Sequence, residues 1–269
     1  MIRTAAILAA GLGSRMRRAD DAAQLDDTQA KVAASGVKGM IPIKRPFLEY
    51  VISALADAGL EHIVLVIGPD HDAIREHFTQ GVTTERVRIS FAVQPTPIGT
   101  ANAVVTAAEH IGDEAFLVLN ADNYYPVEAY RRLAAEATAG TIAFDRHALV
   151  EGGNIDPERV RAFAVLSVSD AGWLTGIVEK PGDALDLASE AARWVGMNLW
   201  AITPALVSAC RHVPISVRGE YELPEAVGMA VREGVPVRAV RMAAAVLDLS
   251  RRSDIAGVVA RLESIEPRL

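Results

Sequence analysis

The first half of the chain alternates between short apolar runs and longer segments with helical spacing. The apolar runs, typical of strands buried on both faces of a sheet, cover residues 4–10, 63–67 and 115–119. Residues 87–93 alternate between apolar and polar positions, which predicts a strand with one more polar face. Helices are predicted over residues 47–55, 99–110 and 127–137, with another from Asp70 as N-cap to His77. Strands alternating with helices at these lengths predict a largely parallel sheet.

The second half of the chain is less regular. Residues 163–168 and 173–178 are predicted to form a hairpin around a turn at Gly172. A strand over residues 194–202, a helix over 223–232, a strand over 237–241 and a helix after Ser250 follow. No internal repeat or Pro/Ser-rich linker divides the chain. We therefore expect one Rossmann-like α/β fold with three layers (α/β/α) and a mixed, mostly parallel central sheet.

Residues 17–36 break this pattern, because they are rich in Ala, Asp and Gln and have no strong apolar face. They are predicted to form a long, mobile loop with no more than a single helical turn. Mobile loops of this kind often cover active sites.

Composition and charge narrow the function classes. With 51% hydrophobic and 23% charged residues, the chain is neither disordered nor a coiled coil. The lone Cys210 excludes a disulfide framework and a cysteine-based zinc site, and it favours a cytoplasmic setting. The apolar run near the N-terminus is too short for a signal peptide, and no segment approaches the ~20 apolar residues of a membrane span. A net charge of −7 argues against non-specific nucleic-acid binding, so an anionic ligand must be held by local groups.

The turn after the first strand is a candidate phosphate-binding loop. Gly11 and Gly13 would allow backbone amides to approach phosphates, and Arg15 would add a cation. Met16 stands where a dinucleotide fingerprint has its third glycine, and no P-loop motif is present. The alternative is an ordinary strand-to-helix turn with a surface arginine. Lys38, before an apolar element, is a weak candidate on its own.

Three further positions carry candidate chemistry. Gln94 ends one strand before Gly99 and Thr100, and its amide suits the edge of a nucleobase, although a plain turn is an equal alternative. Asp122 follows a buried strand, where carboxylate oxygens could bind Mg²⁺ or merely cap a helix, and Asp248 follows another apolar run as a second carboxylate. Glu179 and Lys180 could hold a sugar hydroxyl and a phosphate, or form a surface ion pair. The six histidines show no metal-binding spacing, and no serine-hydrolase motif occurs.

Taken in order, these segments resemble the motifs of the sugar-1-phosphate nucleotidyltransferases, also called nucleotide-sugar pyrophosphorylases. Residues 8–16 are similar to the family's opening LAAGxGTRM, and residues 119–122 resemble its LxGD metal segment. The other matches are Lys38 with Pro42 and Pro46, Gln94 with the Gly99-Thr100-Ala101 turn, Glu179-Lys180-Pro181, Gly196, residues 219–226 and Asp248. Such motifs in register along nearly the whole chain are a strong signal.

The resemblance implies a single nucleotidyltransferase domain over residues 1–269. The enzyme would transfer a nucleotidyl group from an NTP, with UTP or dTTP favoured, to a sugar 1-phosphate, giving an NDP-sugar and pyrophosphate. It implies catalytic roles for Arg15, Lys38 and Lys180, and Mg²⁺ on Asp122 and Asp248. The implied nucleotide-binding residues are Leu8, Ala10, Gly11, Gly13, Ser14, Gln94, Gly99 and Thr100. The implied sugar-phosphate-binding residues are Glu179, Lys180, Gly196 and Asn123.

The chain also departs from the family pattern. Ala121 replaces the usual glycine before the metal aspartate, and Phe163-Ala164 stands where Tyr-Gly is common near the sugar, so the sugar stays open. One alternative is transfer to a non-sugar phosphate acceptor of the phosphocholine or molybdenum-cofactor type. Another is a catalytically silent regulatory subunit that binds nucleotide sugars. The sequence shows no oligomeric state, so a homo-oligomer stays open.

Overall fold

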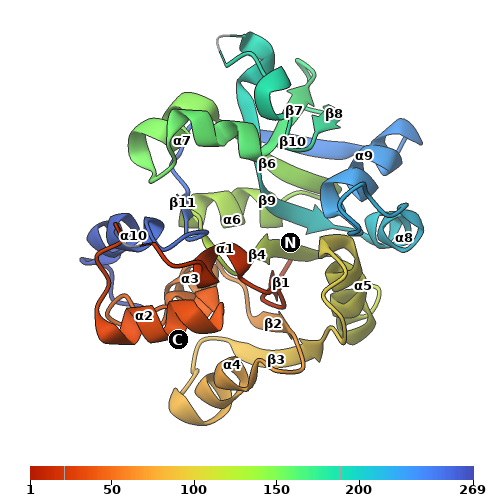
Figure 1. Cartoon of the computed structure of the whole chain (residues 1–269). Coiled ribbons are helices and arrows are strands. Elements are labelled where there is room, and N and C mark those ends of the chain that lie inside the picture. Colours follow the sequence, from red (N-terminus) through yellow and green to blue (C-terminus); the bar gives the residue numbers. More distant parts are fainter. Residues whose placement is uncertain (21, 188) are drawn as a thin grey trace.

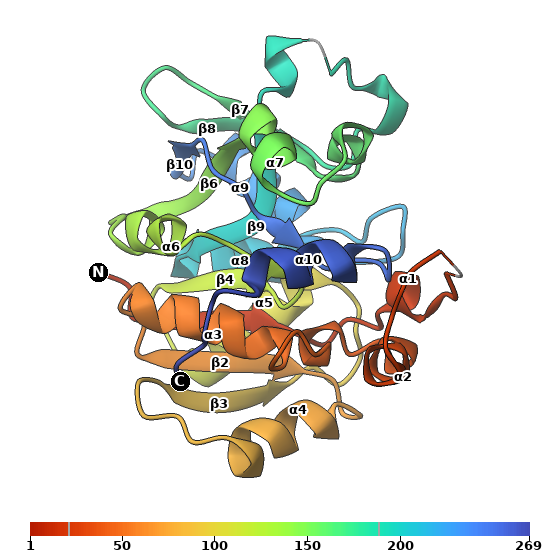
Figure 2. The same ribbon diagram turned by 90° about the vertical axis from the view of Figure 1, so that its left-hand side faces the viewer.

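The computed structural model describes residues 1–20, 22–187 and 189–269. Within these residues, nine strands form one sheet with the main order β10-β6-β9-β4-β1-β2-β3 (Figures 1 and 2). The seven strands on this path are β1 (Thr4–Leu8), β2 (His62–Ile67), β3 (Arg88–Val93), β4 (Phe116–Asn120), β6 (Ala139–Asp145), β9 (Trp194–Ile202) and β10 (Val237–Met242), and β7 and β8 join the sheet beside β9. All neighbours on this path pair in parallel except β9, which runs antiparallel to both β4 and β6. The predicted mixed, mostly parallel sheet is confirmed.

Helices cover both faces of this sheet. One face carries α3 (Phe47–Asp57), α6 (Val127–Ala134) and α10 (Asp254–Leu262), and the other carries α5 (Thr100–Ile111), α8 (Pro204–His212) and α9 (Leu223–Arg232). Strand β1 shows why its run is continuously apolar: Ala5 and Ile7 pack in one hydrophobic cluster, and Ala6 packs in the other. The three-layer α/β/α arrangement is therefore also confirmed.

The remaining elements are short. They are α1 (Ser14–Arg17), α2 (Asp27–Ser35), α4 (Asp72–Glu76), α7 (Arg146–Gly152), β5 (Asn123–Tyr124), β7 (Ala164–Val168), β8 (Leu174–Val178) and β11 (Leu247–Asp248), with helical turns at Lys38–Met40, His77–Gly81, Pro157–Ala162, Gly182–Ala184 and Glu190–Ala192. Strands β7 and β8 form the predicted antiparallel hairpin, and β7 also pairs with β9. Strands β5 and β11 pair antiparallel and set Asp248 opposite Asn123.

The loop prediction for residues 17–36 is wrong over nine of them, because Asp27–Ser35 is helix α2. The Asp26 side chain accepts a hydrogen bond from the Gln29 amide, and the Gln29 side chain accepts one from the Asp26 amide, which forms a capping box. Only Ala33 of this helix is buried, so its apolar face is too small to detect by periodicity. Asp21, also in the segment, lies outside the described residues.

Two further differences concern the start of helix α4 and two elements that the sequence pattern did not predict. Helix α4 begins at Asp72 with His71, not Asp70, at the N-cap position, so the Asp70 cap is wrong. The His71 ring instead accepts a hydrogen bond from the Gly68 amide (2.9 Å). The sequence pattern also did not predict β6 or α8. No helix among the described residues is long and apolar enough to cross a membrane.

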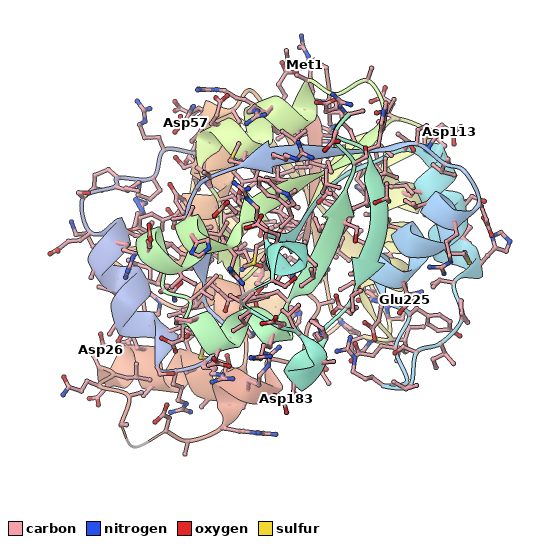
Figure 3. The ribbon with its side chains drawn as sticks, turned by 90° about the horizontal axis from the view of Figure 1, so that it is seen from above. Met1, Asp26, Asp57, Asp113, Asp183 and Glu225 are labelled. Carbon is pink, nitrogen blue, oxygen red and sulfur yellow. The ribbon has the colours of Figure 1, made fainter. Side chains whose placement is uncertain are left out.

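Because most strands are parallel, their amino ends lie on one side of the molecule and their carboxyl ends on the opposite side. Met1, Asp57 and Asp113 precede β1, β2 and β4, and Figure 3 shows all three on one side of the molecule. Asp26 and Asp183 lie on the opposite side, beyond the carboxyl ends of the strands. Ligands of open α/β sheets bind at the carboxyl ends, so this second side is where a site is expected.

Candidate active site

A cavity of about 340 Å³ opens at the carboxyl ends of β1, β3 and β4. Four separate segments form its walls: the loop after β1, residues 36–39 after α2, the turn between β3 and α5, and the loop after β4. Eleven sequence-predicted site residues line it: Leu8, Ala10, Gly11, Gly13, Ser14, Arg15, Lys38, Gln94, Gly99, Thr100 and Asp122. The fold therefore brings together residues that are more than 100 positions apart in the sequence.

The loop after β1 presents unpaired donors to this cavity. Gly13 has a φ of +61°, and a Cβ atom there would lie 2.1 Å from the Gly36 carbonyl oxygen. Glycine at this position is thus required by close contact between the loop and the end of α2. The amides of Gly11, Leu12 and Gly13 donate to no other group within the described residues. The exposed Arg15 side chain forms no ion pair with any described residue. Loop amides and a free guanidinium make this wall suited to an anion.

Lys38 follows the end of α2, where the C-cap residue Gly36 accepts a hydrogen bond from the Lys38 amide (3.0 Å), and its side chain lines the cavity. The Lys38 ammonium lies 2.6 Å from Asp122 Oδ2, and both side chains are mostly buried at 17% and 18% exposure. Partial burial makes this pair stronger than a surface ion pair. Lys38 therefore acts as the counter-charge of Asp122.

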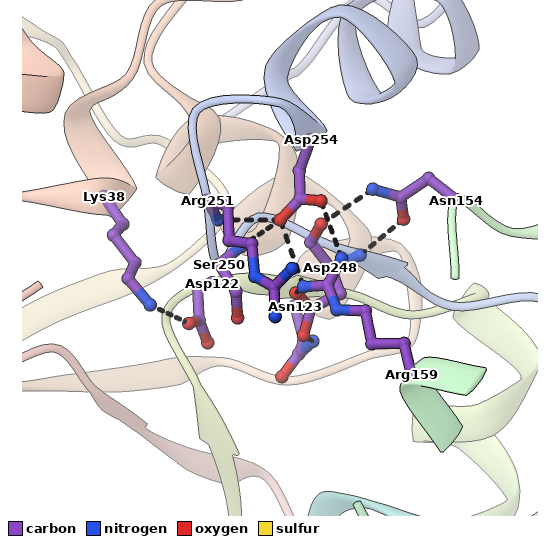
Figure 4. Close-up of polar contacts among 9 residues, drawn as sticks. All are labelled: Lys38, Asp122, Asn123, Asn154, Arg159, Asp248, Ser250, Arg251 and Asp254. Carbon is purple, nitrogen blue, oxygen red and sulfur yellow. Dashed lines mark hydrogen bonds and ion pairs between the residues drawn. The ribbon is translucent and has the colours of Figure 1, made fainter. Parts of the chain in front are cut away.

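Asp248 lies deeper than Asp122, in a network of polar groups that Figure 4 shows. Arg159 forms an ion pair with Asp248 Oδ1 and another with Asp254 Oδ1 (2.6 Å). Asn123 donates to Asp248 Oδ2 (3.2 Å), while the Asn154 side chain bonds to both the amide and the carbonyl of Asp248 (2.8 Å each). Burial raises the pKa of the Asp248 carboxyl, and the charge of Asp122 raises it further, although Arg159 opposes both effects.

These two aspartates can be tested as magnesium ligands from their donor atoms. Asp122 Oδ1 has no partner among the described residues, whereas the Asp248 carboxylate accepts hydrogen bonds from Asn123 and Ser250 in addition to its ion pair with Arg159. No group of three or more His, Cys, Asp or Glu side chains suited to a metal occurs in the described part of the chain. Mg²⁺ commonly takes one or two carboxylates and completes its shell with water and substrate phosphates, so the two aspartates fit this ion.

Gln94 forms the end of the cavity nearest α5. Its side chain is 2% exposed, and its Nε2 donates to Gly99 O (3.1 Å) and to Asn102 Oδ1 (2.8 Å). Gly99 has a φ of +124°, and a Cβ atom there would lie 2.3 Å from the Tyr221 carbonyl oxygen. The Thr100 hydroxyl accepts a hydrogen bond from the Leu223 amide (2.9 Å), so it also ties α5 to α9.

The predicted sugar-side residues do not line this cavity. Lys180, with a φ of +46°, is exposed and lies 3.2 Å from Glu179 Oε1. Arg218 lies 3.6 Å from the same oxygen and pairs with Glu222, which immediately precedes α9. Burial raises the pKa of Glu222, but hydrogen bonds from Ser216 and Arg218 outweigh it, and the net pKa is lowered. The cluster of Glu179, Lys180, Arg218 and Glu222 thus forms a charged border next to Thr100.

Gly196 and Asn123 are both buried. Gly196 lies in β9 opposite Ala143 and Ala164, and Asn123 contacts Asp248 rather than the open cavity. Arg159, Asn102 and Arg218 were not among the predicted site residues. Arg218 and Asn102 had a sequence signal, since Arg218 directly precedes the Gly219-Glu220 motif and Asn102 directly follows the Gly99-Thr100-Ala101 turn, whereas Arg159 had none.

Comparison of the chain with known proteins identifies its family. The family model described as Nucleotidyl transferase matches residues 27–241, most of the chain. The chain belongs to this nucleotidyl transferase family. It is therefore an enzyme of the nucleotidyltransferase class, as the sequence motifs predicted.

Individual relatives of this nucleotidyltransferase agree. UTP–glucose-1-phosphate uridylyltransferase AglF of Haloferax volcanii is 30% identical over 257 residues, which cover 93% of this chain and 92% of the relative. A glucose-1-phosphate thymidylyltransferase of Streptomyces griseus is 28% identical, with 98% of this chain and 67% of the relative covered.

Solved structures share the fold. A UDP-glucose pyrophosphorylase complexed with UDP-glucose superposes with a TM-score of 0.76 at 16% identity, covering 99% of this chain and all (100%) of the other. A UTP-bound enzyme of Acinetobacter baumannii gives a TM-score of 0.74 at 21% identity, with 99% and 96% covered. The nucleotidyltransferase thus has the architecture of these enzymes from end to end.

Proposed function

We propose that the protein transfers a nucleotidyl group from UTP or dTTP to a sugar 1-phosphate, giving an NDP-sugar and pyrophosphate, with Mg²⁺ as cofactor. The observation that carries this proposal is that one cavity is lined by the loop amides after β1, by the cations Arg15 and Lys38 and by the Gln94 amide. Asp122 lies on the same wall as Lys38. The names of the relatives, which are uridylyl- and thymidylyltransferases of glucose 1-phosphate, support it.

In this proposal the phosphate oxygen of the sugar phosphate attacks the α-phosphorus in line, so that the P–O bond to pyrophosphate breaks as the new one forms. The residues act by positioning and by neutralising charge. The amides of Gly11, Gly13 and Ser14 would hold the phosphates, with Arg15 and Lys38 on the developing pyrophosphate. Mg²⁺, held by Asp122 and Asp248, would supply further charge neutralisation.

The sugar phosphate would enter from the charged border. Lys180 would orient its attacking phosphate, and Glu179 would accept hydrogen bonds from sugar hydroxyls. Gly196 would contribute indirectly, because a Cβ atom there would lie 3.2 Å from Leu166 Cδ2 and would disturb the packing of β7 on β9. Asn123 would hold Asp248 in position. Leu8 and Ala10 would contact the nucleoside.

The base preference follows from the hydrogen bonds of Gln94. Because both Nε2 hydrogens are already donated, only Oε1 remains for a ligand, and it can only accept. Uracil and thymine carry an N3–H donor, whereas cytosine N3 and adenine N1 carry no hydrogen. This difference favours uracil, thymine and guanine over cytosine and adenine, and the names of the relatives then favour UTP or dTTP over GTP.

The direct test is pyrophosphate release from five NTPs combined with a panel of sugar 1-phosphates, with Mg²⁺ or with EDTA. We expect release with UTP or dTTP and glucose 1-phosphate or a close relative, and none with EDTA. Release with only a non-sugar phosphate acceptor would support that alternative instead. Nucleotide binding without any release would indicate a silent regulatory subunit.

Lys38→Met is expected to lower kcat by about 10², since a charge-stabilising donor of this kind contributes ~10²–10³. In the free protein, the same substitution should tighten Mn²⁺ binding, because the metal no longer competes with the ammonium for Asp122. Mn²⁺ titration followed by electron paramagnetic resonance measures this second effect. Lys31→Met, at an exposed lysine of α2, is the matched control and should change neither quantity. Unchanged turnover in Lys38→Met would contradict its catalytic role.

A further inference from the structure

The amide of Gln94 is held in one orientation by two neighbours of different kinds. Gly99 offers a backbone carbonyl, which accepts hydrogen bonds and cannot donate them. A Gln94 amide turned by 180° would place Oε1 against this carbonyl oxygen, 3.1 Å away, and would lose the bond. The main chain of Gln94 is also fixed, because its amide donates to Ile67 O at 2.9 Å.

Asn102 occupies the second hydrogen of the same nitrogen. Its Oδ1 lies 2.8 Å from Gln94 Nε2, a shorter contact than the one to Gly99. Asn102 is in the first turn of α5, and it is not among the residues that line the cavity. It therefore acts on the ligand only through Gln94.

We propose that Asn102 is a positioning residue that sets base specificity by leaving Gln94 only an acceptor to present. This inference rests on the proposed use of a nucleoside triphosphate in the cavity. A pyrimidine with an N3–H donor can donate to Gln94 Oε1. A pyrimidine with a lone pair on N3 would place that lone pair against the Oε1 acceptor. The discrimination thus includes a repulsive element built against cytosine.

Loss of the Asn102 oxygen would release one Gln94 N–H. Gln94 would then be held by Gly99 alone, and its side chain would be free to turn this N–H toward the cavity beside Oε1, where cytosine N3 could accept the hydrogen bond. A hydrogen bond is worth about 0.5–1.5 kcal/mol net, which corresponds to a change of up to about tenfold in relative efficiency.

The experiment compares kcat/KM for UTP and CTP in four proteins: the wild type, Asn102→Leu, Asn102→Asp and Thr106→Val. We expect the CTP-to-UTP ratio to rise about tenfold in Asn102→Leu. It should stay at the wild-type value in Asn102→Asp, since a carboxylate still accepts from Nε2. Thr106→Val is the matched control on α5, because its hydroxyl bonds only to the Asn102 carbonyl within the described residues.

A purely structural role for Asn102 would lower the efficiencies for both nucleotides together and leave their ratio unchanged, and this outcome would overturn the proposal. Asn102→Ala serves as a second variant if Asn102→Leu does not fold, and calorimetric dissociation constants for UTP and CTP provide the ratio without turnover. A wild-type enzyme that uses neither UTP nor dTTP would contradict the proposed function itself. A wild-type preference for UTP that survives in every Asn102 variant would contradict only the present inference.

Discussion

Arg15→Ala is expected to lower kcat for pyrophosphate release by about 10³ while leaving the melting temperature unchanged. The side chain is exposed on the cavity wall, so its removal breaks no ion pair or side-chain hydrogen bond among the described residues. Its guanidinium would face the negative charge that develops on the leaving pyrophosphate. Removal of one such group typically costs ~10²–10³ in turnover, and the full charge of an arginine places the loss at the upper end.

The assay is steady-state pyrophosphate release at saturating UTP or dTTP and sugar 1-phosphate, together with thermal unfolding. Arg18→Ala is the control, because Arg18 is exposed three residues later, just after α1, and lies outside the cavity walls. Near-normal turnover of Arg15→Ala would remove the central cation from the proposed mechanism.

Arg159→Met is expected to destabilise the protein by about 3–5 kcal/mol. Arg159 is 8% exposed and is the ion-pair partner of both Asp248 and Asp254, which are themselves buried. The substitution leaves two carboxylates without their counter-charge, and breaking a buried pair by removing one partner typically costs this amount. For a protein of this size the loss corresponds to a decrease of roughly 10 °C in melting temperature.

Differential scanning calorimetry of the metal-free proteins measures this decrease. Arg251→Met is the matched control, because the Arg251 side chain is exposed and only its backbone amide bonds to Asp254 (2.7 Å). A melting temperature for Arg159→Met within about one degree of the control would show that the network contributes little to folding.

The cavity residues were predictable because of where they stand in the sequence. Asp122 follows the apolar run of β4, and Gly11 closely follows β1. Because these strands pair in parallel, both residues lie at the carboxyl ends of neighbouring strands. Gln94 follows β3 in the same way. Apolar runs report burial on both faces of the sheet, and the carboxyl ends of such strands are binding sites in open α/β sheets.

The surroundings of Asp248 were not predictable by the same reasoning. The two-residue strands β5 and β11 are too short to show any periodicity, and their pairing depends on the whole fold. Arg159 lies in a helical turn whose residues carry no spacing signal toward Asp248 or Asp254. Helix α2 was missed for a different reason. Its capping box at Asp26 and Gln29 is visible in the sequence, but the helix buries only Ala33 and therefore shows no apolar periodicity.

The pairing of β5 with β11 also has a consequence for biosynthesis. Asn123 and Asp248 are 125 positions apart, so Asn123 leaves the ribosome long before its partner exists. At synthesis rates of ~5–20 residues per second, the delay is roughly 6–25 s. During this interval β5, which contains Asn123, has no β11 to pair with. The part of the site that contains Asp248 therefore forms only after β11 has been synthesised.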